Sequence, residues 1–157
     1  MNKLFAVLLL AMTMLACTQS NDYKKITSNP DLYAYTVHEL NQVVMGNNFS
    51  PIVASRNYAY AAIAGYEVVA AGNPSAYQSL AGQLKGLAQM PKPKDTANID
   101  FPYAALVAYA TVGQAVTFPE GSMQDYTDSL RKLVKSNGMS GKMVEASEAF
   151  AIWTTFN

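Results

Sequence analysis

Residues that can carry acid–base or metal chemistry are scarce in this sequence. It has one histidine, His38, and one cysteine, Cys17. A nucleophilic triad needs a base beside its serine or cysteine, and a zinc site needs three or four nitrogen, sulfur or carboxylate ligands. Glu145 and Glu148 are three positions apart, but a di-iron bundle site pairs such glutamates with histidines. We therefore predict no catalytic, cofactor-binding or metal-binding residue in this chain, with His38 partly exposed on a helix and the two glutamates on a solvated face.

Cys17 has a different chemistry, which is lipid attachment. An apolar run from Leu4 to Leu15 precedes it, and this run is shorter than the ~20 residues that a membrane-spanning helix needs. Such a length is typical of a signal peptide, which we expect to cover residues 1–16. The sequence Met-Leu-Ala-Cys at 14–17 resembles the lipobox of bacterial lipoproteins, although Met14 stands where leucine is commonest.

Lipidation of Cys17 would make the protein an exported lipoprotein attached to the membrane, on the periplasmic face or in the outer membrane. Residues 17–28 would then form a tether, and residues 29–157 a helical domain. The alternative is ordinary cleavage near Ala16, which would leave Cys17 as a free thiol.

The charge balance argues against a nucleic-acid partner. Lysine plus arginine and aspartate plus glutamate both total 11, so no basic excess is available to neutralise phosphates. Hydrophobic residues make up 50% of the chain and charged residues only 14%, a composition that can fill a core and excludes wholesale disorder.

Proline, glycine and apolar periodicity divide the chain into helices. Asn29-Pro30-Asp31 and Ser50-Pro51 are typical helix starts, and glycines follow at typical helix ends. The segment after Pro102 is almost free of charge, which is typical of a helix at the centre of a bundle. Ser122 with Asp125 forms a capping-box pattern. No strand is predicted, and the fold class is all-α, a compact bundle of about six helices: 30–46, 51–72, 74–91, 102–116, 122–137 and 141–157, with a linker at 91–100.

One polar stripe interrupts the second of these helices. Arg56, Tyr60, Ile63 and Glu67 follow one line along the helix, with Arg56 and Glu67 about 16 Å apart by helical rise. They cannot pair with each other across that distance. Because a buried charge requires a partner, we expect each to contact another helix.

Two segments in order carry a family resemblance: NFSPIVASRNYAYAAIAGYE at 48–67 and YQSLAGQLKGLAQMP at 77–91. Together they resemble the N-terminal helical region of bacterial vanadium-dependent haloperoxidase relatives, in the superfamily of type-2 phosphatidic acid phosphatases. Lipoprotein members of this group are common in the Bacteroidetes. The similarity is best from about Pro30 to Phe118. These segments consist of packing residues, so they identify lineage and carry no chemistry.

The resemblance implies an all-helical bundle whose active site binds vanadate or a phosphoryl group. The family signature has a lysine and an arginine, then a Ser-Gly-His motif, then an arginine with a histidine. This sequence has no glycine-histidine pair, no arginine-proline pair and no second histidine. No catalytic position carries over, and vanadate would be a cofactor of complete relatives only. The resemblance therefore implies a family member truncated before its catalytic half.

Three interpretations follow. The first is a non-catalytic helical half of a haloperoxidase/phosphatase-type lipoprotein, and the second is a stand-alone lipid-anchored binding module of the bacterial envelope. The third keeps enzymatic function through assembly with a separately encoded catalytic half. On the truncation interpretation, the last helix exposes an apolar face around Phe150 and Trp153, where we expect self-association.

Overall fold

A computed structural model describes residues 20–89, 92–93 and 96–156 of the chain. The expected signal peptide at 1–16 and the lipid-attachment residue Cys17 lie outside the described residues. The fold is all-α, as predicted: the described residues form six helices, and their one β-type contact is an isolated bridge between Ala81 and Leu84. The helices are α2 (Tyr23–Thr27), α3 (Pro30–Gly46), α4 (Pro51–Gly72), α5 (Phe101–Ala115), α6 (Gln124–Ser136) and α7 (Gly141–Phe156).

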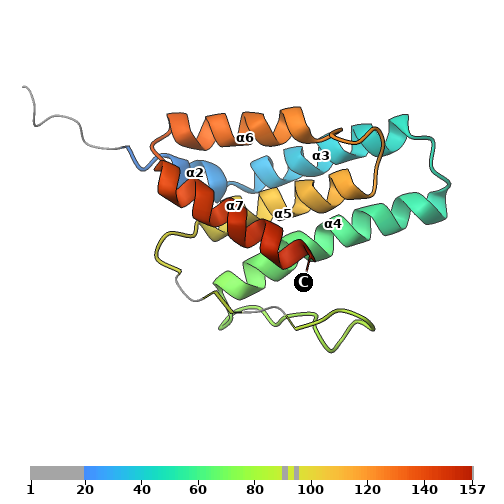
Figure 1. The fold of residues 1–157 in the computed structure, drawn as a ribbon, viewed down its shortest axis with the longest axis horizontal. Coiled ribbons are helices and arrows are strands. Elements are labelled where there is room, and N and C mark those ends of the chain that lie inside the picture. The colour runs from blue at the N-terminus through green and yellow to red at the C-terminus, as the bar shows by residue number, and fades with distance from the viewer. Residues whose placement is uncertain (1–19, 90–91, 94–95, 157) are drawn as a thin grey trace, which may run out of the picture.

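Helix α5 lies at the centre of the bundle, and α3, α4, α6 and α7 pack around it (Figure 1). Every residue from Tyr103 to Ala110 is buried, because a helix that is apolar on all sides is stable only when other helices cover all of them. The buried residues around it include Val68 of α4, Leu130 and Val134 of α6, and Val144 and Ala151 of α7.

The helix starts follow the local signals in the sequence. Asn29 caps α3 by accepting a hydrogen bond from the backbone N–H of Asp31 at 2.9 Å, and Asp100 caps α5 by accepting from Tyr103 at 2.9 Å. The capping box predicted at Ser122 does not form. Helix α6 begins at Gln124 without a side-chain cap, and the Ser122 hydroxyl lies 3.0 Å from that of Thr117 instead.

The helix predicted over 74–91 is wrong. The described part of this segment is a chain of turns that runs along α4 (Figure 1). Gly82 and Gly86 adopt φ angles of +78° and +87°, in the left-handed region that ends helices. The apolar residues at helical spacing therefore belong to a loop.

The expected tether also contains structure. Residues Tyr23–Thr27 form the short helix α2, in which Tyr23 and Thr27 are buried. The backbone N–H of Tyr23 donates to the carbonyl of Asn137 at 3.0 Å, which fixes α2 beside the end of α6. The helices of the described residues thus begin at Tyr23, within the segment that was expected to form the tether.

Candidate functional site

The residues whose side chains could carry acid–base or metal chemistry lie apart in the fold. His38 is exposed on α3, as predicted, with its Nε2 3.4 Å from the Gln42 side chain. Arg56 is exposed on α4, and within the described part of the chain its guanidinium has no ion-pair partner. The prediction that Arg56 contacts another helix is therefore wrong. Glu145 is exposed on α7, as predicted.

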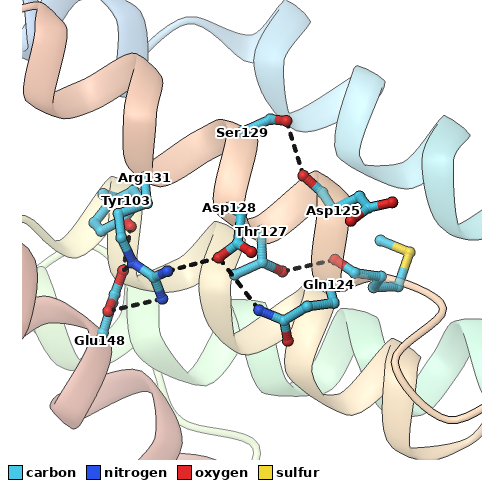
Figure 2. A network of polar contacts seen from close by, with 9 residues as sticks. Tyr103, Gln124, Asp125, Thr127, Asp128, Ser129, Arg131 and Glu148 are labelled. Carbon is cyan, nitrogen blue, oxygen red and sulfur yellow. Dashed lines mark hydrogen bonds and ion pairs between the residues drawn. The ribbon is translucent and has the colours of Figure 1, made fainter.

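The prediction that Glu148 lies on a solvated face is wrong. Its carboxylate takes part in a network of polar contacts (Figure 2). The Tyr103 hydroxyl donates to Glu148 Oε1 at 2.6 Å. Arg131 Nε donates to the same oxygen at 2.7 Å, and a terminal guanidinium nitrogen lies 3.2 Å from Oε2. Arg131 also pairs with Asp128 at 2.6 Å. One carboxylate on α7 thus connects the central helix α5 with α6.

The directions of the pKa shifts in this network indicate a structural contact. Burial, and then the hydrogen bond to Glu148, raise the pKa of Tyr103 above its ordinary value. The Glu148 carboxylate raises the pKa of Arg131, so the guanidinium stays charged. A tyrosine that keeps its proton and an arginine that keeps its charge do not exchange protons near neutral pH. The network therefore holds three helices together and offers no acid–base pair.

Glu67 is the buried charged residue of α4, with a relative exposure of 2%. Its partners come from the loop after α4, because the Ser79 hydroxyl donates to Oε2 at 2.7 Å and the Leu80 backbone N–H donates to Oε1 at 2.6 Å. The prediction of a partner on another helix is wrong for Glu67 as well. This carboxylate fixes the turns that follow residue 78 against α4.

Two cavities meet the Glu67 side chain. One, of about 500 Å³, lies between α4, α5, the end of α7 and loop residues 84–87. The other, of about 340 Å³, lies between α4 and loop residues that include Pro74, Ser79 and Gln89. Sequence reasoning missed this site because it assigned 74–91 to a helix. The available signal was Glu67 itself, an acidic residue within the apolar run Ile63–Ala71, where a buried charge requires local partners.

Vanadate, the group that the resemblance implies, does not fit the residues present. His38 and Arg56 are exposed on different helices, and Arg131 is committed to the carboxylates of Glu148 and Asp128. The described residues also contain no group of three or more His, Cys, Asp or Glu side chains that would hold a metal ion.

Among residues 20–89, 92–93 and 96–156, no helix combines the length and apolar character needed to cross a bilayer.

The comparisons with known proteins agree with the resemblance. No family model matches the sequence, and no curated protein matches it. Among solved structures, the chain is similar to the crystal structure of a bacterial vanadium-dependent iodoperoxidase, with 33% sequence identity and a TM-score of 0.73. The match covers 80% of this chain but 30% of the iodoperoxidase. The chain is therefore similar, in sequence and in fold, to part of a bacterial vanadium-dependent iodoperoxidase.

Proposed function

We propose that this protein is a lipid-anchored, exported relative of the vanadium haloperoxidases whose 157 residues do not themselves form a vanadate site. The observation that carries the proposal is the combination of 33% identity to an iodoperoxidase with a single histidine, His38, that is exposed on α3. The family motifs inferred from the resemblance need two histidines. On this proposal the chain supplies the helical scaffold of such an enzyme and is inactive alone.

Activity assays on the purified chain test this proposal directly. With vanadate, peroxide and iodide present, we expect no halide oxidation above a protein-free control, and with a phosphomonoester no hydrolysis. Turnover in either assay that disappears in His38→Ala would show that His38 is a working catalytic histidine. That result would overturn the proposed inactivity.

The membrane anchor is tested separately at Cys17. We expect metabolic labelling with a radioactive fatty acid and recovery of the protein in the membrane fraction, both lost in Cys17→Ser. The mass of the mature N-terminus distinguishes the two interpretations, since ordinary cleavage near Ala16 would leave Cys17 without acyl chains. An unmodified Cys17 would refute lipidation and leave the relationship to haloperoxidases intact.

Two partners are proposed for the protein surface: a catalytic portion like that in the rest of the iodoperoxidase, and a second copy of this chain. The end of α7 supports both, because Ile152 and Trp153 are 49% and 41% exposed there. Phe150, expected on the same exposed face, is buried instead at 5% exposure and packs edge-to-face on Phe101 with a centroid distance of 5.6 Å.

A second candidate function is a stand-alone binding lipoprotein of the envelope. The cavity of about 500 Å³ beside Glu67 favours it, since this volume lies within the range of small-molecule sites. Saturable binding of a small molecule by a chain that lacks haloperoxidase activity would support this candidate.

A further inference from the structure

The larger cavity beside Glu67 has the character of a small-molecule site. Its volume is about 500 Å³, and its walls come from α4, α5, the end of α7 and the loop. Ile63, Leu84 and Val112 contribute apolar surface to it. Binding pockets for small molecules are typically apolar with a few polar groups that fix the orientation of the ligand. The identity of those polar groups therefore determines which ligand the cavity suits.

The first polar group is the carboxylate of Glu67. It is 2% exposed, and each of its oxygens accepts one hydrogen bond, from the Ser79 hydroxyl and from the Leu80 N–H. Within the described residues no cation lies within ion-pair distance of it. Buried carboxylates are normally compensated by a positive charge. The oxygens of Glu67 also retain lone pairs that can accept further hydrogen bonds.

Two threonines at the end of α7 line the same cavity. Thr154 Oγ1 donates to the carbonyl of Ala151 at 2.7 Å, and Thr155 Oγ1 donates to the carbonyl of Ile152 at 2.7 Å. A hydroxyl has one proton to donate, so towards a ligand both threonines can act only as acceptors in this arrangement. The polar groups contributed by Glu67, Thr154 and Thr155 are thus acceptors, and Tyr60, which also lines the cavity, has a hydroxyl that can donate or accept.

We propose that this cavity binds a small apolar molecule that carries a primary ammonium group. An ammonium supplies three N–H donors and a positive charge, which no described residue places beside the Glu67 carboxylate, whereas a carboxylate head group would be repelled by Glu67. Lys85 also lines the cavity but is exposed to solvent, and its charge opposes the entry of a cation. Neutralising Glu67 should therefore weaken the binding of an ammonium ligand, whereas neutralising Lys85 should strengthen it.

Three probes with the same apolar chain and different head groups test the proposal: hexylamine, hexan-1-ol and hexanoate. Binding is followed by the fluorescence of Trp153, which is the single tryptophan of the sequence and precedes Thr154. We expect the purified protein to bind hexylamine at least tenfold more tightly than hexan-1-ol, because hydrogen bonds to a charged group are the stronger ones. Hexanoate should bind most weakly.

Matched variants assign this preference to the cavity. Glu67→Gln should reduce the affinity for hexylamine to that for hexan-1-ol, while Glu145→Gln, a neutralisation at an exposed position of α7, should change nothing. Lys85→Gln should strengthen hexylamine binding about twofold to threefold and weaken hexanoate binding. Circular dichroism checks folding, and Lys85→Gln decides the question if Glu67→Gln is unfolded.

Several results would overturn the proposal. Equal affinity for the three probes would show a merely apolar cavity, and no saturable binding of any probe would show that it takes no such ligand. If folded Glu67→Gln still prefers hexylamine, the ammonium group binds elsewhere. The same conclusion follows if Lys85→Gln leaves the order and the affinities of the three probes unchanged. None of these results depends on whether the chain has haloperoxidase activity.

Discussion

Glu148 is the residue through which α5, α6 and α7 are tied together (Figure 2). The side chain of Glu148 is only 17% exposed, and that of its partner Arg131 is 38% exposed. The exposed part of Arg131 reduces the value of the ion pair, because solvent screens it. The hydrogen bond from the buried Tyr103 hydroxyl is not screened in this way, so the contribution of Glu148 to stability comes mainly from satisfying Tyr103.

Glu148→Ala should lower the free energy of unfolding by about 2 kcal/mol, since it leaves the Tyr103 hydroxyl buried without its acceptor. Urea unfolding followed by circular dichroism measures the change. Glu145→Ala is the matched control on the same helix, where exposure predicts a change within about 0.5 kcal/mol. Equal effects of the two substitutions would contradict the role assigned to the network.

One buried tyrosine, Tyr109, and one half-buried tyrosine, Tyr126, give the protein a predicted sensitivity to alkali. Burial raises the pKa of Tyr109 and of Tyr126 to about 12. Because the pKa is raised in the folded state, the resulting stability is complete below the unfolded-state pKa of about 10 and is lost as the pH rises from about 10 to 12. The free energy of unfolding should therefore fall in that range.

Tyr126→Phe should make the alkaline fall in stability shallower, although it also removes the 2.6 Å contact between the Tyr126 and Thr36 hydroxyls and so lowers stability at neutral pH. Tyr60→Phe, at an exposed position, is the control and should leave the slope unchanged. Urea unfolding at a series of pH values gives the slopes. Identical slopes for the two variants would show that Tyr126 does not cause the loss.

At the scale of elements, Gly113 determines how closely α5 approaches α3. A Cβ atom at Gly113 would lie 2.8 Å from Leu40 Cδ1, and Leu40 is fully buried. By contrast, nothing lies within 4 Å of the position that a Cβ would occupy at Gly46, the last residue of α3. The two glycines are therefore present for different reasons, the first for packing and the second as a helix end.

Gly113→Ala should lower the free energy of unfolding by about 1–3 kcal/mol, because a methyl group in a filled space forces Leu40 or the backbone to move. Gly46→Ala adds the same methyl group in open space and should change stability by less than about 1 kcal/mol. Thermal and urea unfolding of both variants give the comparison. A neutral Gly113→Ala would mean that Leu40 or the backbone can move without cost, and that Gly113 does not set the approach of α5 to α3.

Local signals predicted most helices well, and long-range contacts explain the failures. Proline at the start and glycine at the end placed α4 at Pro51–Gly72, as observed. The segment 74–91 has helical apolar spacing, yet its described part forms turns, because Gly82 and Gly86 take positive φ and Glu67 binds the backbone at Leu80. Glu148 was predicted to be solvated because its partner Arg131 lies on a different helix, and a contact between two helices cannot be inferred from local sequence.

At the scale of the whole molecule, large apolar side chains are exposed on several elements, among them α3, α4, the loop after α4 and α7. Ile152 and Trp153 at the end of α7 are 49% and 41% exposed, close in sequence to the threonines of the cavity. Exposed apolar side chains that lie next to each other are candidates for an interaction site. The chain spans 30% of the length of the iodoperoxidase.

The purified chain should therefore associate with itself through α7 and bind an apolar fluorescent dye. Both effects should increase with the concentration of the protein. Ile152→Lys should reduce association and dye binding, because a lysine at a half-exposed position keeps its charge in water and interrupts the apolar surface. Ile52→Lys is the matched control, since Ile52 on α4 is 69% exposed but belongs to a different element. Sedimentation over a range of concentrations measures association. A strictly monomeric protein, or equal effects of the two lysines, would show that α7 is not the contact surface.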